Sequence, residues 1–157
     1  MGNGRFDTIA YASFSANATR LLDKSTGLYR DRTVHETFTN VRIDPYLDPR
    51  DITVRESCDS DANPTSTPII LGLDVTGSMG SIALQFARES IGKLMNKIYE
   101  QRPVSDPHVM FMGIGDAWCD SAPLQVSQFE ADIRIAEQLV KLYVEGGGGG
   151  NNSESYT

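Results

Sequence analysis

Three oxygen-bearing side chains stand at alternate positions in the chain. Asp74, Thr76 and Ser78 follow directly on the apolar run 68–73, and a helical pattern begins after them. One carboxylate and two hydroxyls are the hard oxygen ligands that a hard divalent cation prefers. Their types and spacing therefore predict a site for a divalent cation, with Asp74 as the least replaceable ligand. The alternative is a strand-to-helix turn in which the two hydroxyls merely cap the helix.

A second aspartate is expected at the same place. Asp116 follows another apolar run, 108–115. In an open α/β sheet the carboxyl ends of the strands share one edge, and ligands usually bind there. Asp116 is interpreted in one of two ways: it orients a metal-bound water, or it is an ordinary aspartate in a surface turn. Trp118 and Asp120 nearby either form a rim that faces a partner, or Trp118 covers the base of a hairpin.

The elements that must position these residues alternate between strand and helix. Short apolar or alternating runs predict strands, and apolar residues at three- and four-residue steps predict helices. The expected strands are 68–73, 108–115 and 123–129, and the expected helices are about 79–100 and 130–145. The second helix is expected to place Ile133, Ala136, Val140 and Tyr143 on one stripe. Residues 68–157 therefore read as an α/β domain.

Residues 1–67 differ from the rest of the chain. They are rich in Thr, Arg, Asp and Asn and show no sustained helical stripe. Segments in which β-branched and aromatic residues alternate with polar ones are strand candidates, at 7–14, 33–38 and 52–57. We therefore expect an irregular, β-containing N-terminal extension over 1–67, followed by the α/β domain over 68–157.

Composition argues against several classes of function. The net charge is −7 without a cluster of Lys or Arg, so nucleic acid and anionic membranes are not expected partners. No apolar run approaches the roughly 18 residues of a membrane span, and residues 1–5 lack the apolar core of a secretory leader. Cys58 and Cys119 lie far apart and are expected to be free thiols. A single disulfide between them is the alternative. These features favour a cytoplasmic protein.

Catalysis is not expected. The chain has no Gly-x-x-x-x-Gly-Lys phosphate loop and no Gly-x-Ser-x-Gly elbow. His108 stands at the start of its strand, at the end away from Asp74, so it is poorly placed as a general base. The sequence predicts a protein that is not an enzyme.

The segment Asp-Val-Thr-Gly-Ser-Met at 74–79 resembles the metal-ion-dependent adhesion site of von Willebrand factor A domains, whose first motif is Asp-x-Ser-x-Ser with Thr tolerated. The order of elements in 67–157 is similar to the first half of such a domain, of the intracellular type found in bacteria and phages. The resemblance implies a Rossmann-like open sheet, here a partial one with about three strands and two helices.

The resemblance also implies a second metal loop after a glycine run. The matching position after the glycines at 146–150 is Asn151. Its amide oxygen can coordinate a divalent cation but carries no charge, so it would be a weak ligand. The other interpretation is that these glycines cap the preceding helix and lead into a flexible tail.

For function, the resemblance implies a metal-dependent protein-binding module, an adaptor or assembly factor. Asp74, Thr76 and Ser78 would hold Mg²⁺, and a Glu or Asp of a protein partner would complete its coordination. The family has further strands that are lacking here, so the strand 68–73 is expected to have an open edge. A longer protein, a completing chain or the N-terminal region could supply its neighbour. The alternative function is therefore structural: oligomerisation through this edge, with a vestigial metal site.

Overall fold

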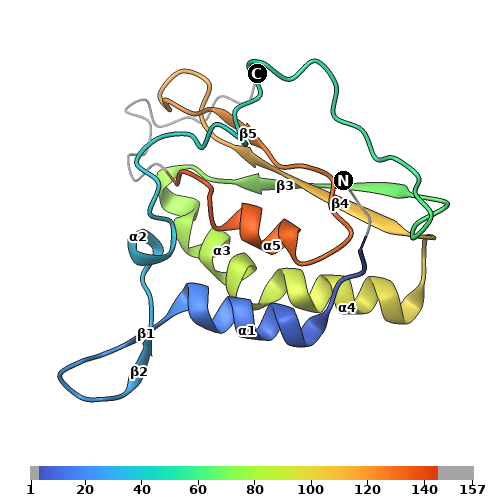
Figure 1. Cartoon of the computed structure of the whole chain (residues 1–157). Coiled ribbons are helices and arrows are strands. Elements are labelled where there is room, and N and C mark those ends of the chain that lie inside the picture. The colour runs from blue at the N-terminus through green and yellow to red at the C-terminus, as the bar shows by residue number, and fades with distance from the viewer. Residues whose placement is uncertain (1–3, 145–157) are drawn as a thin grey trace.

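The fold is an open sheet with helices against one side and a long irregular segment along the other (Figure 1). A computed structural model describes residues 4–144 of the 157, except for the side chain of Ser78. The expected α/β class is confirmed. No helix within residues 4–144 is long and apolar enough to cross a membrane.

The sheet has three strands in the order β3-β4-β5. Strands β3 (Thr67–Asp74) and β4 (Pro107–Ile114) run parallel, with Asp74 opposite Ile114. Strand β5 (Leu124–Val126) runs antiparallel to β4. All three predicted strands are therefore present, the third shorter than the predicted 123–129. Because β4 and β5 lie on the same side of β3, β3 is an edge strand among the described residues.

The predicted helix after β3 is also confirmed, with one irregularity. It consists of the 3₁₀ turn η1 (Gly77–Met79), α3 (Gly80–Gln85), the π-helical turn η2 (Phe86–Ser90) and α4 (Ile91–Gln101). Its apolar face lies against the sheet. The fully or almost fully buried side chains on this face include Leu84, Ile91, Met95 and Ile98.

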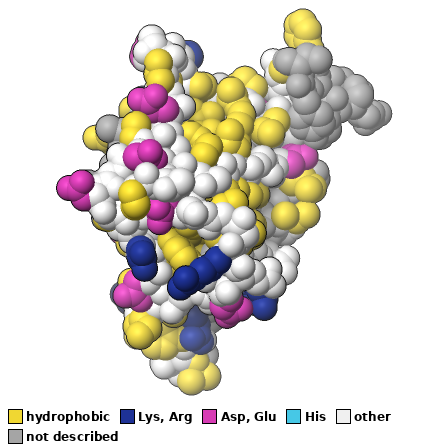
Figure 2. All heavy atoms as spheres, turned by 90° about the vertical axis from the view of Figure 1, so that its right-hand side faces the viewer, with side chains coloured by type: hydrophobic (Ala, Val, Ile, Leu, Met, Phe, Trp, Pro, Cys, Tyr) yellow, Lys and Arg dark blue, Asp and Glu magenta, His cyan; other side chains and the backbone are white. Residues whose placement is uncertain are grey.

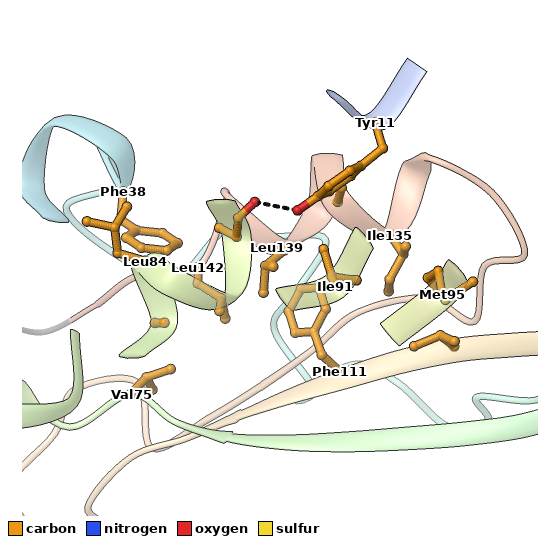
Figure 3. Close-up of a cluster of buried hydrophobic side chains, with 14 of the residues drawn as sticks. Tyr11, Phe38, Val75, Leu84, Ile91, Met95, Phe111, Ile135, Leu139 and Leu142 are labelled. Atoms are coloured by element: carbon orange, nitrogen blue, oxygen red, sulfur yellow. Dashed lines mark hydrogen bonds between the residues drawn. The ribbon is translucent and has the colours of Figure 1, made fainter. Parts of the chain in front are cut away.

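Helix α5 (Arg134–Leu139) packs against the same core and is shorter than predicted. Figure 3 shows its side chains around Phe111 of β4. Of the predicted stripe, Ala136 is buried, Ile133 and Val140 are partly buried against the core, and Tyr143 is half-buried. The fully buried residues are instead Ile135, Leu139 and Leu142. The helix ends at Leu139, and turns beyond it point Leu142 inward.

The first strand candidate, 7–14, was wrong: this segment belongs to helix α1 (Thr8–Thr19). The Asp7 side chain caps the helix by accepting hydrogen bonds from the backbone N–H groups of Ile9 and Ala10 at 2.8 and 3.1 Å. A cap of this kind provides an acceptor for two of the N–H groups that the first turn leaves unpaired.

The other two candidates were also wrong. The segment 33–38 contains the short helix α2 (Val34–Thr37), which begins with a capping box between Thr33 and Glu36. The segment 52–57 is irregular. The β-structure described in this region is a hairpin of β1 (Arg20–Leu22) and β2 (Tyr29–Asp31), whose residues are all exposed.

Helix α1 packs against the π-helical turn η2. In η2 the N–H of Ile91 bonds to the carbonyl of Phe86, five residues back. Two carbonyls of the turn accept hydroxyl hydrogen bonds from α1: the Tyr11 hydroxyl donates to Ala87 at 3.0 Å (Figure 3), and Ser15 donates to Arg88 at 2.5 Å. Hydroxyl groups of the N-terminal region therefore satisfy backbone groups at the irregular turn, as buried polar groups require.

The core is shared between the two parts of the chain. Phe6, Tyr11, Phe38 and Leu47 belong to the same cluster of buried side chains as the sheet and its helices. The segment around Leu47 also reaches β5, because the N–H of Val126 donates to the Leu47 carbonyl at 2.8 Å.

Figure 2 shows hydrophobic surface through the middle of the face at which β3 begins, with acidic side chains along one border.

The capping box of α2 leads to a prediction about pH. Glu36 accepts two hydrogen bonds from the Arg30 guanidinium and one from the Thr33 N–H. These bonds, Arg30 first, lower the pKa of Glu36 from 4.5 to about 2. A lowered carboxyl pKa means that its stabilising effect is complete above about pH 4.5 and is lost as the pH falls through about 2.

We expect an NMR titration to place the Glu36 pKa near 2, and Arg30→Gln to raise it toward 4.5. Arg20→Gln removes the same charge from the neighbouring strand, and no Arg20 hydrogen bond to Glu36 is described. This control variant should leave the Glu36 pKa low. An unchanged pKa in Arg30→Gln would contradict the assigned cause.

Candidate metal site

The site begins at the carboxyl end of β3, where Asp74 and Thr76 are joined by hydrogen bonds. Both the N–H of Thr76, at 2.9 Å, and its hydroxyl, at 2.6 Å, donate to Oδ1 of Asp74. Thr76 is only 2% exposed. The N–H of Val75 donates to the Ile114 carbonyl at 2.9 Å, which ties the loop to β4. The two side chains are therefore held together by the sheet and by each other.

The direction of the Thr76 hydrogen bond bears on the chemistry of the site. Thr76 stands at the N-cap position of η1, yet no capping bond from its side chain is made within the described residues. Its proton goes to Asp74 instead. A hydroxyl has one proton and two lone pairs, so donation to Asp74 leaves its oxygen able to act as a ligand. The helix-capping interpretation does not hold for Thr76, and the donor set fits a divalent cation.

Two predicted ligands lie partly or wholly outside the described structure. The backbone of Ser78 is in η1, directly after the Asp74–Thr76 pair, but its side chain is not described. Asn151 lies beyond the described residues altogether. The structure thus brings together Asp74 and Thr76 of the four proposed ligands.

Asp116 lies at the same edge of the sheet, two residues after the end of β4. The surface-turn interpretation was wrong, since Asp116 is fully buried. Its Oδ1 accepts hydrogen bonds from the N–H groups of Trp118 and Cys119 at 2.7 and 2.8 Å. Asp116 therefore shapes the loop that follows β4, beside the candidate site.

Asp120 closes this loop from its other end. Its Oδ2 accepts from the N–H of Asp116 at 2.7 Å, and its own N–H donates to the Asp116 carbonyl at 3.0 Å. A Cβ at Gly115 would lie 2.5 Å from this carboxylate. Glycine at this position therefore leaves space for the Asp120 side chain. This pairing was not among the features predicted from the sequence. Its signal was a glycine at a strand end followed by two aspartates four residues apart, residues typical of tight turns.

Trp118 projects from the Asp116–Asp120 loop and is 81% exposed. The interpretation that it covers the base of the hairpin was therefore wrong. Aromatic side chains of this size dominate many protein interfaces when they become buried. An exposed indole beside the candidate site is consistent with a rim that faces a partner.

The remaining candidate groups lie elsewhere. Cys58 and Cys119 are free thiols, as expected. His108 is buried at the start of β4, with its Nδ1 2.8 Å from the Ser57 hydroxyl, at the opposite end of the sheet from Asp74. Within residues 4–144, no three His, Cys, Asp or Glu side chains form a metal-binding group, so the candidate site depends on hydroxyl ligands beside Asp74.

Comparisons with known proteins add no family to this description: no family model matches the chain, and neither does a curated protein or a solved structure.

Proposed function

We propose that this chain is a metal-dependent protein-binding module of the von Willebrand factor A type, built on a Rossmann-like sheet. The observation that carries the proposal is the Asp74–Thr76 pair at the carboxyl end of β3, in which the hydroxyl bonds to the carboxylate instead of capping the helix. The parallel pairing of β3 and β4, which brings Asp116 to the same edge, supports it further.

Asp74, Thr76 and Ser78 would hold Mg²⁺ or Mn²⁺, with Asn151 as a weaker contributor. The cation would supply a coordination position for a Glu or Asp side chain of a protein partner. Mg²⁺ keeps several waters and needs few protein ligands, which suits a site with one carboxylate. Asp116 would keep the neighbouring loop in place, and Trp118 would contact the partner beside the cation.

The test is calorimetric titration of MgCl₂ and of MnCl₂ into the purified chain. We expect the parent to bind and Asp74→Asn to bind at least about 10-fold more weakly, because it removes the site's main charge. Asp51→Asn is the matched control: it removes one carboxylate charge from an exposed position in the irregular segment and should bind like the parent.

Fluorescence gives a second readout from the same samples. Trp118 is the chain's single tryptophan, and its loop follows β4 at the edge of the sheet where Asp74 lies. Its emission should change on addition of MgCl₂ in the parent and in Asp51→Asn, but not in Asp74→Asn. Equal affinity of the parent and Asp74→Asn for both cations, with circular dichroism showing both folded, would refute the proposal.

A further inference from the structure

The outer edge of β3 is the feature that the proposed function leaves unused. The N–H of Thr67 donates to the Asp106 carbonyl at 3.0 Å, and the N–H of Val75 donates to the Ile114 carbonyl at 2.9 Å. In a parallel pair, alternate residues of a strand bond to the neighbour. The odd-numbered residues of β3 therefore face β4, and the even-numbered residues direct their backbone groups outward.

Ile70 and Gly72 form the middle of this outward edge. Since the sheet ends at β3 within residues 4–144, their N–H and C=O groups have no neighbouring strand there. The side chain of Ile70 is 54% exposed, and Gly72 is exposed as well. A long apolar edge of this kind is a template for pairing with another strand.

The composition of β3 is that of an interior strand. The run 69–73 is apolar on both faces, a pattern typical of parallel strands covered on both sides. Leu71 is only half-buried, whereas its neighbour in β4, Phe111, is fully buried. The side chains of β3 thus lack cover on the side away from β4.

We propose that a second copy of this chain pairs with the first along β3, antiparallel and with a two-fold axis at Leu71. In this register Ile70 lies opposite Gly72 of the second copy. Both residues direct their N–H and C=O groups outward, so each pair exchanges two hydrogen bonds. The two sheets become one continuous six-stranded sheet.

Pro68 and Asp74 disfavour the two neighbouring registers. Pro68 has no N–H to donate. Pairing Ile70 with Ile70 would place Pro68 opposite Gly72 and leave the Gly72 carbonyl without a donor. Pairing Gly72 with Gly72 instead would place the apolar Ile70 opposite the Asp74 carboxylate. The two-fold axis at Leu71 instead moves Pro68 to the end of the ladder, opposite Asp74.

The side chains agree with the same register. Directly opposite residues of an antiparallel pair lie on the same face of the sheet. The exposed Ile70 side chain therefore covers Gly72 of the second copy, which has no side chain to obstruct it. On the other face Leu71 meets Leu71, and Ile69 meets Leu73. No two like charges stand opposite each other within 68–74.

The test is the molar mass of the chain by size exclusion with light scattering, in buffer containing EDTA. The expected mass is twice the 17.2 kDa of the chain. Because EDTA removes divalent cations, the result does not depend on the proposed metal site. Ile70→Lys places a charge on the edge and should reduce the mass to 17.2 kDa. Val54→Lys, at a position 69% exposed in the irregular segment, is the matched control and should remain a dimer.

Amide hydrogen exchange on the unmutated chain identifies the edge itself. We expect the Ile70 and Gly72 amides to be protected, and their protection to fall on dilution and in Ile70→Lys. A monomeric parent with rapidly exchanging Ile70 and Gly72 amides would overturn the proposal. So would a dimer in which these two amides exchange rapidly, because that dimer would use another surface.

Discussion

Replacing Asp116 with alanine is expected to lower the free energy of unfolding by about 2–4 kcal/mol. The substitution removes the oxygen that accepts hydrogen bonds from the N–H groups of Trp118 and Cys119. A fully buried donor left without an acceptor costs on the order of 1–3 kcal/mol. These two hydrogen bonds are part-buried, so water that reaches the N–H groups recovers part of the cost. Urea unfolding followed by circular dichroism measures the loss.

Asp116→Asn separates the hydrogen bonds of this residue from its charge. Asparagine keeps a carbonyl oxygen that can accept from the same two N–H groups, so the expected loss of stability is under about 1 kcal/mol. If Asp116 also orients a ligand at the metal site, affinity for Mg²⁺ should fall about 10-fold or more in this variant. Equal destabilisation by the two substitutions would show that the loop does not depend on the oxygen.

The second large effect is expected at Gly92, in α4. A Cβ at this position would lie 2.2 Å from Cε1 of Tyr11, far inside van der Waals contact. Gly92→Ala must therefore displace the Tyr11 ring and its hydrogen bond to the Ala87 carbonyl. Overpacking of this kind costs about 1–3 kcal/mol, which outweighs the roughly 1 kcal/mol that alanine contributes in a helix. Thermal unfolding should show a lower midpoint.

A double-mutant cycle tests the cause. In a Tyr11→Ala background the ring is absent, so Gly92→Ala should raise stability by about 0.5–1 kcal/mol through helix propensity alone. The sign of the effect therefore changes between the two backgrounds. The same destabilisation in both would mean that contact with Tyr11 is not the reason for glycine at this position.

Patterns of apolar residues predicted the part of the fold that buries apolar side chains. The strands β3 and β4 and the helix between them follow this rule. Helix α1 does not, because its buried side chains are Tyr11, Ser15 and Thr19, two of which are small hydroxyl residues. The Ser15 hydroxyl donates to the Arg88 carbonyl, and the Thr19 hydroxyl donates to the Ser15 carbonyl. Because this helix buries hydroxyl groups, its sequence shows no apolar stripe from which a helix could be predicted.

Local chemistry was predictable where both partners lie close in the chain. Asp74 and Thr76 are two residues apart, and their pairing follows from the loop after β3. The capping box of Thr33 and Glu36 was not predicted, although its Thr-x-x-Glu spacing is the usual signature and counts against the strand expected at 33–38. The burial of Asp116 was not readable, because it depends on how Asp120 closes the loop around it.

The contact between α1 and the π-helical turn has a consequence for synthesis on the ribosome. Tyr11 and its acceptor at Ala87 are separated by 76 residues. At roughly 5–20 residues per second, Tyr11 is synthesised about 4–15 s before its acceptor. An isolated helix of 12 residues is marginal in water, so this segment waits unfolded and open to chaperones and proteases. Helix α1 therefore gains this packing partner only after residues 86–90 have been made.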